Sequence, residues 1–404
     1  MSVSSVGPPS PRERQAATLQ QSFSVHYRYA VHFTECLFAD DNDLLARVLC
    51  AAAPERRNRF IVFYDDGLEA AIPGLAGDIE AYAGRHAERI ELVAAPMAMP
   101  GGERIKAGYE HFERMQRALF DNHIDRHSYV VGIGGGALLD AVGLAAATAH
   151  RGVRHVRVPT TVLAQNDSGV GVKNGVNRYG AKNFTGTFAP PFAVINDMAF
   201  IDVLPARDKI AGMAEAVKVA LIRDIDFYRW LEARVEALAA FEPDALSYLI
   251  RRCAELHMHQ IAHGGDPFEA GSARPLDYGH WAAHKLEAMT AHELRHGEAV
   301  AIGMALDTRY AVAGGMLAEG NDERVCRLLE RLGFELWHPA LEARDDDGQY
   351  SVLGGLRDFQ EHLGGDLTVT LLRELGVGFE VHEMDYGLID KAIAWLKRRR
   401  LTAC

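Results

Sequence analysis

Three side chains in the C-terminal half of the chain are of the types that hold a catalytic zinc ion. They are Glu215, His280 and His296, and two imidazoles with one carboxylate leave a coordination position for a substrate oxygen. Spacing alone does not single out this set, because a chain with 18 histidines contains many such triples. His280 and His284, four residues apart on one helix face, make an equally good local pair. Each histidine also fits an ordinary hydrogen-bonded helix position, so the spacing leaves the choice of metal ligands open.

A second candidate site is the segment from Val130 to Asp140, which reads Val-Val-Gly-Ile-Gly-Gly-Gly-Ala-Leu-Leu-Asp. A β-branched apolar run leads into Gly134, Gly135 and Gly136, so the pattern predicts a strand, a tight turn and a helix start. Glycines let the backbone approach a ligand closely, and a helix N-terminus offers N–H groups to a pyrophosphate. The spacing departs from G-x-G-x-x-G, so dinucleotide binding and a plain tight turn both remain open.

Polar residues also follow two neighbouring strand patterns. Asp65 ends the buried run Arg59–Tyr64, and Thr160 and Thr161 follow the run His155–Val158. Ligands of parallel sheets bind beyond the carboxyl ends of the strands, where these residues and the glycines would meet. Asp65 is suited to a ribose hydroxyl or, equally, to capping the Asp-Gly turn that follows it.

A polar, glycine-rich segment runs from Asn166 to Asn183 and carries Lys173, Arg178 and Lys182. We expect a long irregular loop here. A solvated loop is the plain alternative, but a long irregular loop inside a compact domain is usually functional.

Strand and helix patterns alternate up to about Pro205, after which helix patterns follow alone. Such alternation indicates a parallel sheet covered on both faces. The expected strands include Ser22–Phe33, Arg59–Tyr64, Ile90–Ala95 and His155–Val158. The expected helices include Leu44–Ala53, Arg104–Asp121, Ala211–Ile222, Phe227–Ala240, Pro243–His263, Asp277–Thr290 and His296–Tyr310. We therefore predict an α/β plus α chain, with a mobile tail over residues 1–21, a Rossmann-like parallel-sheet domain over 22–205 and an all-helical metal-binding domain over 206–404.

Composition narrows the class of protein. The 404 residues are 48% hydrophobic and 24% charged, as in a soluble globular protein. A net charge of −12 argues against nucleic acid as the main partner. The five cysteines contain no C-x-x-C pair, which favours reduced thiols in the cytoplasm. No signal peptide and no apolar run of membrane-spanning length is evident.

Taken together, several segments resemble the sugar phosphate cyclases, the 3-dehydroquinate synthase superfamily, from about Asp65 to Tyr310. Their order and spacing are specific to that superfamily. The segments are Gly134-Gly135-Gly136 with Asp140, Arg151-Gly152, Val158 to Gln165 with Asp167, Lys173, Lys182-Asn183, Leu204-Pro205, Gly212 to Glu215 with Lys218, Gly279-His280 with His284, and His296 to Val300.

The resemblance implies a dehydroquinate synthase-like fold, a homodimer and an active site in the cleft between the two domains. It implies that zinc, or cobalt, is held by Glu215, His280 and His296. It implies NAD binding by Asp65, Glu103, Lys106, Gly134, Gly135, Gly136, Asp140, Thr160, Thr161 and Lys182. The substrate positions that it implies are Asp167, Lys173, Lys182, Asn183, Lys218, Arg274 and His284, together with Arg151, which would reach the phosphate across the dimer.

The reaction implied by the resemblance needs no net oxidant. A secondary alcohol is transiently oxidised, the ketone acidifies the neighbouring C–H, and phosphate leaves by β-elimination. The carbonyl is then reduced, and the enol closes the ring by an aldol step. Lysine and arginine side chains must grip the phosphate throughout.

Departures from 3-dehydroquinate synthases bear on the substrate. Asp277 stands where those enzymes carry asparagine near the substrate carboxylate, and His259 stands where they carry lysine. Arg274 is offset by one residue from the expected arginine. The C-terminal Asp-Lys-Lys is absent, and the corresponding stretch of this chain includes His362. An aspartate would repel a carboxylate and accept hydroxyls, so we expect a neutral sugar phosphate, with sedoheptulose 7-phosphate as the family's obvious choice.

The product and the reaction class have alternatives. In the family, 2-epi-5-epi-valiolone synthases usually carry proline where this chain keeps His284, so His284 with Asp277 looks more like the 2-epi-valiolone synthases. The runners-up are 2-epi-5-epi-valiolone synthase and 3-dehydroquinate synthase. A metal-dependent polyol dehydrogenase of the same build would share the glycine turn but lack the Lys173, Lys182 and Lys218 set. A degenerate relative that only binds sugar phosphates is the alternative outside catalysis.

Overall fold

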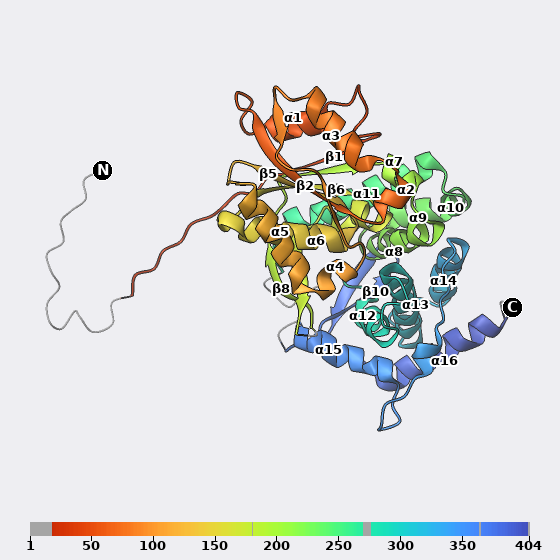
Figure 1. The fold of residues 1–404 in the computed structure, drawn as a ribbon. Helices are drawn as coiled ribbons and strands as arrows, with labels where there is room; N and C mark the ends of the chain where they lie inside the picture. The colour runs from red at the N-terminus through yellow and green to blue at the C-terminus, as the bar shows by residue number, and fades with distance from the viewer. Residues whose placement is uncertain (1–17, 180, 270–275, 363–364, 403–404) are drawn as a thin grey trace, which may run out of the picture.

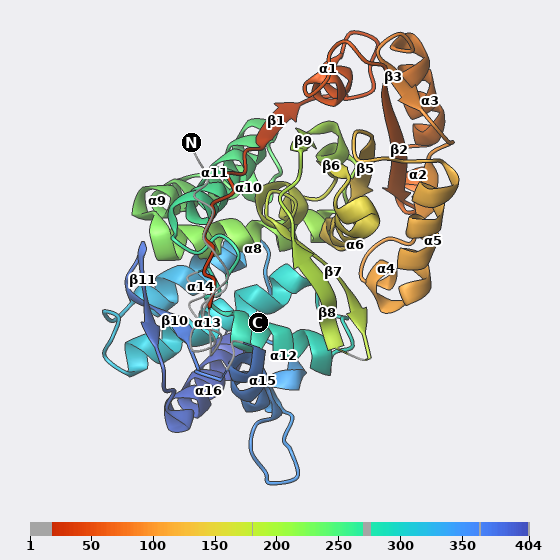
Figure 2. The ribbon, with the colours of Figure 1, turned by 90° about the vertical axis from the view of Figure 1, so that its left-hand side faces the viewer.

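The computed structural model describes residues 18–179, 181–269, 276–362 and 365–402. Within them, seven parallel strands form one sheet in the order β1-β9-β6-β5-β2-β3, and β4 also pairs with β2 (Figure 2). The strands are β1 (Ala30–Thr34), β2 (Asn58–Asp65), β3 (Ile90–Leu92), β4 (Met97–Met99), β5 (Tyr129–Gly134), β6 (Arg154–Pro159) and β9 (Ala193–Asp197). The predicted parallel sheet is confirmed.

Helices cover both faces of this sheet (Figure 1). They are α1 (Leu44–Cys50), α2 (Leu68–Ala71), α3 (Leu75–Arg85), α4 (Arg104–Ala107), α5 (Tyr109–Asp121), α6 (Gly136–Thr148) and α7 (Ala199–Asp202). Strand β2 shows why the sheet needs two layers. Its side chains Phe60 and Val62 enter the core shared with α1 and α3, whereas Ile61 and Phe63 enter the core shared with α5 and α6. Each buried side chain of this kind contributes roughly 2 kcal/mol.

The strand order of the sheet reverses between β2 and β5, which makes this place its topological switch point. The chain leaves β2 for β3 and β4 on one side and then returns to β5 on the other. Crevices at such switch points bind ligands at the carboxyl ends of the strands. A Cβ atom on Gly134 would lie 3.2 Å from Cβ of Asp65, so the two predicted cofactor residues are direct neighbours there.

The C-terminal part is a helical layer around one large core (Figure 1). Helix α13 is its centre and packs against α8, α12, α14 and α16. The helices are α8 (Ala206–Arg223), α9 (Ile225–Ala233), α10 (Val235–Ala239), α11 (Pro243–His263), α12 (His280–Met289), α13 (His296–Ala313), α14 (Asn321–Arg331), α15 (Gly354–His362) and α16 (Tyr386–Thr402). An antiparallel hairpin, β10 (Val369–Glu374) and β11 (Val377–Val381), accompanies the predicted helices, so this part is mainly helical rather than all-helical as predicted. Across the described ranges, every helix is too short or too polar to cross a bilayer.

The prediction of an irregular loop from Asn166 to Asn183 is wrong. The segment begins within a π-helical turn, Ala164–Ser168, and contains strand β7 (Lys173–Arg178) and the start of β8 (Ala181–Phe188), which form an antiparallel hairpin. The signal was a period of two in Val170, Val172, Asn174 and Val176, all of which are buried. Glycines and polar residues between them masked this alternation.

Three smaller predictions also need correction. The first strand begins at Ala30 rather than at Ser22. The predicted helix Arg104–Asp121 is interrupted at Gly108, whose extended backbone (φ −122°, ψ 123°) separates α4 from α5. The predicted helix Phe227–Ala240 is divided into α9 and α10 at Arg234.

A buried cation holds the connection between β6 and β7. Arg157 is fully buried within β6, and its guanidinium donates to the carbonyls of Gly169 and Gly171 at 3.1 and 2.9 Å. It also donates to the carbonyl of Lys173 at 3.0 Å and to Oδ1 of Asn174 at 2.7 Å. Burial lowers the pKa of Arg157. The segment that carries Asp167 and Lys173 is thus anchored from inside the sheet.

We predict that Arg157→Met lowers the free energy of unfolding by about 3 kcal/mol or more, because several buried carbonyls lose their donor. Chemical denaturation measures this loss. Arg154→Met, on the same strand but partly exposed, is the matched control and should cost less than about 1 kcal/mol. Equal losses in the two variants would contradict the anchoring role.

Candidate active site

The glycine turn joins β5 to α6 at the switch point. Gly135 has extended backbone (φ −71°, ψ 171°), and no side chain caps the first turn of α6. A side chain at Gly136 would collide with the Ser168 hydroxyl, so the backbone here is closely packed. The N–H of Thr160 donates to the Gly134 carbonyl at 3.0 Å and brings the next strand end alongside. This arrangement is suited to an anion at a helix N-terminus.

The two other polar residues predicted at this edge have local partners. Oδ1 of Asp65 accepts a hydrogen bond from the Gly67 N–H at 2.9 Å, so it does cap its own turn. Burial raises the pKa of Asp65. Oγ1 of Thr161 accepts from the Ala164 N–H at 3.1 Å and so caps the π-helical turn.

Lys106 links the nucleotide side of the site to the hairpin. It is buried, and its ammonium lies 2.6 Å from Asp140 Oδ2 and 2.9 Å from Asn183 Oδ1. Although burial lowers it, the pKa of Lys106 is raised by the carboxylates of Asp140 and Glu103. Oε2 of Glu103 is itself buried and has no hydrogen-bond partner among the described residues. Three predicted cofactor residues and one predicted substrate residue therefore meet here.

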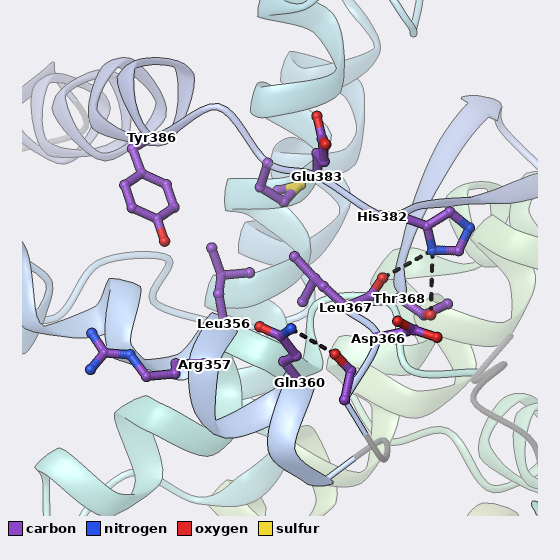
Figure 3. A pocket seen from close by; sticks show the side chains of 11 residues that line it. Leu356, Arg357, Gln360, Asp366, Leu367, Thr368, His382, Glu383 and Tyr386 are labelled. Carbon is purple, nitrogen blue, oxygen red and sulfur yellow. Dashed lines mark hydrogen bonds between the residues drawn. The ribbon is translucent and has the colours of Figure 1, made fainter.

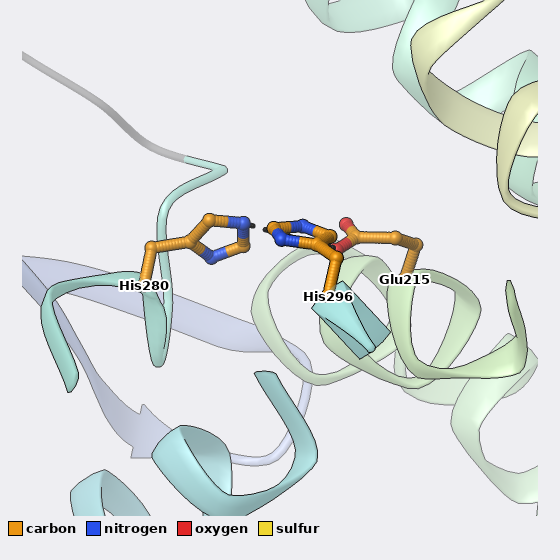
Figure 4. A group of neighbouring side chains, drawn as sticks. All are labelled: Glu215, His280 and His296. Atoms are coloured by element: carbon orange, nitrogen blue, oxygen red, sulfur yellow. Dashed lines mark ion pairs between the residues drawn. The ribbon is translucent and has the colours of Figure 1, made fainter. Parts of the chain in front are cut away.

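The three predicted metal ligands converge from three helices (Figure 4). Oε1 of Glu215 lies 3.4 Å from His296 Nε2 and 3.8 Å from His280 Nε2. Ligand atoms around one tetrahedral zinc ion lie about 3.4 Å apart, given bonds of about 2.1 Å. Within the described chain, neither oxygen of Glu215 accepts a hydrogen bond of ordinary geometry, although Lys218 forms an ion pair with Oε2. The donor set and its spacing fit a divalent cation.

A second group of possible ligands shares His296 and adds His284 and Glu287. His284 is exposed, whereas Glu215 and His280 are buried. In the second group His296 would have to use Nδ1, which faces Glu287 at 3.3 Å. The Glu215 group is therefore the better enclosed of the two.

Close backbone packing brings these helices together. A side chain at Gly297 would collide with the carbonyl oxygen of Ala211, so only glycine lets the start of α13 lie on α8, next to Glu215. Asp307, fully buried on α13, accepts hydrogen bonds from the Gly279 N–H at 3.0 Å and from Trp281 Nε1 at 2.8 Å. Burial raises the pKa of Asp307 to about 7. These bonds hold the start of α12, where His280 is the first residue.

Neighbouring charges and burial shift the pKa values of all three predicted metal ligands. Although burial raises it, the pKa of Glu215 is held at about 2 by Lys218 and His296. Burial lowers the pKa of His280 well below its usual value, which leaves the neutral imidazole that a metal ligand requires. Although burial lowers it, the pKa of His296 is raised to about 10 by Glu287 and Glu215. A cation is therefore favoured where these groups meet.

On the hairpin, the predicted substrate lysines pair with glutamates, whereas Asp167 on the π-helical turn pairs with a histidine. Lys173 Nζ lies 2.7 Å from Glu269 Oε1, and Lys182 Nζ lies 3.5 Å from Glu287 Oε1. On the π-helical turn, Asp167 Oδ1 lies 2.7 Å from Nδ1 of a histidine in α11. The lysines thus join the hairpin to the C-terminal part.

Two further predicted substrate residues lie at the start of α12 and close before it. Asp277 is close enough to Lys218 to raise the pKa of that lysine, after its nearer partners Glu215 and Asp167. The ring of His284 lies 5.3 Å from that of His280 and 6.1 Å from that of His296. Both residues thus lie near the predicted metal ligands.

Of the remaining predicted residues, two lie away from this place and two lie outside what the structure describes. Arg151 is exposed and precedes β6 at the opposite edge of the sheet from Thr160. His259 is exposed, and its ring stacks on that of His263 at 4.5 Å. Arg274 lies outside the described residues, as does the side chain of His362 at the end of α15.

Several residues at the site were not predicted from the sequence. Glu287 lies seven residues after His280 and three after His284, so helical spacing offered a signal. Arg157 was signalled by its charge inside a buried strand. The partner of Asp167 is His257, whose position on a long amphipathic helix gave no such signal.

A cavity of about 860 Å³ lies elsewhere, between α15 and the start of α16 (Figure 3). Arg357, Asp366, His382 and Tyr386 are among its lining residues, and none of the predicted site residues whose side chains the structure describes lines it. Volume alone therefore does not locate the chemistry in this molecule.

Comparison with known families agrees with the geometry. Residues 96–211 match the model of the 3-dehydroquinate synthase N-terminal domain, and residues 212–348 match that of its C-terminal domain. The chain belongs to the 3-dehydroquinate synthase family. The resemblance inferred from the sequence is thereby confirmed, and the chain is an enzyme of the sugar phosphate cyclase, carbon–oxygen lyase class.

Individual relatives of the 3-dehydroquinate synthase family span most of the chain. A 3-dehydroquinate synthase from Shewanella frigidimarina is 35% identical over 307 residues, which are 76% of this chain and 82% of that protein. The solved 2-epi-5-epi-valiolone synthase from Streptomyces hygroscopicus, with NAD+ and Zn2+ bound, has a TM-score of 0.81 at 28% identity and covers 94% of this chain and 100% of that one. A 2-deoxy-scyllo-inosose synthase with carbaglucose-6-phosphate, NAD+ and Co2+ shares the fold, with a TM-score of 0.71 at 24% identity over 90% of this chain and 95% of that one.

We predict that His280→Ala loses bound zinc, because it removes one of three converging ligands, whereas His284→Ala retains it. Metal per chain after gel filtration, measured by mass spectrometry, distinguishes the two variants. Loss of zinc in His284→Ala with retention in His280→Ala would instead assign the metal to the group of His284, Glu287 and His296.

Proposed function

We propose that this enzyme cyclises a neutral, hydroxyl-rich sugar phosphate with loss of phosphate, and that the substrate is sedoheptulose 7-phosphate. One observation carries the proposal. Lys182 of β8 forms an ion pair with Glu287 beside the metal cluster. The next residue, Asn183, accepts a hydrogen bond from Lys106 in the nucleotide half. Cationic, nucleotide-binding and metal-ligating groups therefore meet between the two halves. A substrate that is oxidised, loses an anion and is reduced without leaving its site needs such convergence.

We infer that NAD lies across the switch point, over the glycine turn, with Asp65, Lys106 and Asp140 around it. We infer that zinc or cobalt is held by Glu215, His280 and His296. The neighbours that hold NAD+ with Zn2+ or Co2+ support both inferences. When bound, NAD supplies a reversible hydride acceptor and the metal supplies a Lewis acid for an alcohol oxygen.

The lysines act as fixed cations. Although burial lowers it, the pKa of Lys218 is raised by Glu215 and Asp167, so this ammonium stays charged and holds oxygens rather than removing protons. Lys173 and Lys182, on the hairpin beside their glutamate partners, bind the phosphate. Phosphate is a better partner than a single carboxylate because it offers more acceptor oxygens and more charge.

Asp277 selects the substrate by charge. Its carboxylate is near enough to Lys218 to raise the pKa of that lysine, which supports a place beside the cluster. A substrate carboxylate at this position would meet a like charge, whereas hydroxyl groups would find an acceptor. Asp277 together with His284 favours 2-epi-valiolone as the product. The fold match to a 2-epi-5-epi-valiolone synthase and the identity to 3-dehydroquinate synthases keep those two activities as the alternatives.

We further propose a cytoplasmic homodimer in which Arg151 reaches the phosphate in the partner's site. Arg151 precedes β6, whereas Thr160 follows the other end of that strand, and this separation supports a role for Arg151 in another copy. All four cysteines in the described ranges are unpaired, and three of them are buried, which agrees with a reducing compartment.

Incubation with sedoheptulose 7-phosphate tests the proposal. We expect one phosphate released per substrate, no net NADH by absorbance, and a cyclitol whose NMR spectrum assigns the epimer. Accumulation of NADH without phosphate would indicate a dehydrogenase. Phosphate release only from the carboxylated sugar phosphate of 3-dehydroquinate synthases would indicate that activity instead.

We predict that Asp277→Asn raises kcat/KM for that carboxylated substrate by at least about tenfold, because removal of a like charge is worth 1.4 kcal/mol or more. Steady-state phosphate release measures the change. Glu293→Gln, at an exposed position beyond α12, is the control and should leave the ratio of the two substrates unaltered. Unchanged discrimination in Asp277→Asn would remove Asp277 as the selecting residue.

A further inference from the structure

The imidazole of His296 lies between two carboxylates. Its Nε2 faces Glu215 Oε1 at 3.4 Å, and its Nδ1 faces Glu287 Oε2 at 3.3 Å. The nitrogen turned to Glu215 is the one that a metal in the Glu215 cluster would use. The other nitrogen must then carry the hydrogen and donate it to Glu287.

Glu287 is well placed to hold a ring in this way. It is 4% exposed on α12, and its second oxygen, Oε1, faces Lys182 Nζ at 3.5 Å. The carboxylate is thus fixed by a cation from β8 on one side and occupied by the imidazole on the other. A buried charge paired on both sides has little freedom to move.

The other histidine of the cluster is oriented differently. Nδ1 of His280 lies 3.1 Å from the carbonyl oxygen of Tyr278, which belongs to its own chain segment. No side-chain substitution can remove that acceptor. The orientation of His296, in contrast, depends on the side chain of Glu287, which also contacts Lys182 of the hairpin.

From this geometry we infer that Glu287 is a positioning residue: it orients His296 for the metal, and through Lys182 it couples metal affinity to the position of the β7–β8 hairpin. The inference rests on the proposed metal centre. Partners of this kind, which accept the second ring hydrogen of a ligating histidine, typically change metal affinity by 10–100-fold when they are removed.

Zinc affinity of the purified full chain tests the inference without any substrate. Competition with a chromophoric chelator gives the affinity, and the absorption spectrum of the cobalt-loaded protein reports the ligand geometry. We expect Glu287→Gln to weaken zinc binding by about 10–100-fold and to alter the cobalt spectrum. Glu232→Gln is the matched control, because Glu232 is a partly buried carboxylate on α9 that pairs with Arg324. This variant should bind zinc as the wild type does.

Two additional variants keep the outcomes distinct. Glu215→Ala should lose zinc altogether, and if it does not, the proposed metal centre itself is wrong. If Glu215→Ala loses zinc while Glu287→Gln binds it with wild-type affinity, only the role of Glu287 is overturned. Should Glu287→Gln fail to fold, Glu287→Asp retains the charge at a shorter reach, and wild-type affinity in that variant would equally overturn the role.

The coupling to the hairpin has its own measurement. Lys182→Met should weaken zinc binding by at least about twofold in the wild-type background, because it frees one side of Glu287, and should have no effect in the Glu287→Gln background. An equal shift in both backgrounds would show that Lys182 acts by its charge alone and would remove the hairpin from the inference.

Discussion

A negative charge with almost no exposure lies at the centre of this enzyme. Glu215 is 1% exposed in the middle of α8, and a buried carboxylate is tolerated only with close partners. Lys218 lies on the same helix, but the imidazoles of His280 and His296 must be brought from the starts of two other helices. Satisfying this one charge therefore requires α8, α12 and α13 to meet at these residues, within the core that the three helices share. The close approach at Gly297 and the buried Asp307 follow from that requirement.

The two halves of the chain are joined by a small element rather than by the large cores alone. The β7–β8 hairpin leaves the sheet and reaches α12 (Figure 2). One end of it is anchored by Arg157 inside the sheet, and its other strand contacts both Lys106 and Glu287. Ligands bound in either half would therefore lie next to residues that contact the β7–β8 hairpin.

Much of the site could be predicted because its residues lie at element ends. Asp65, Gly134 and Thr160 follow strands whose apolar runs are evident, and parallel strands bring their ends to one edge. Glu215, His280 and His296 could be assigned through the family resemblance but not by spacing. The hairpin was missed because its alternation is spread among glycines. The partners of the site residues, such as Asp307 and His257, were missed because contacts between distant helices leave no local pattern.

Asn183 shows how narrowly one position of this hairpin is specified. The register of the hairpin shifts between Val176 and Arg178, and opposite this irregularity Asn183 adopts a left-handed backbone conformation (φ 53°) while its N–H donates to Asn177 Oδ1 at 2.8 Å. Asparagine, aspartate and glycine are the residues that tolerate such a backbone. Glycine would leave Lys106 without its amide acceptor, and aspartate would add a second anion beside Asp140. Asparagine is therefore the one residue that meets both the backbone and the charge requirement. We expect substitutions at this position to be deleterious even though the residue is exposed.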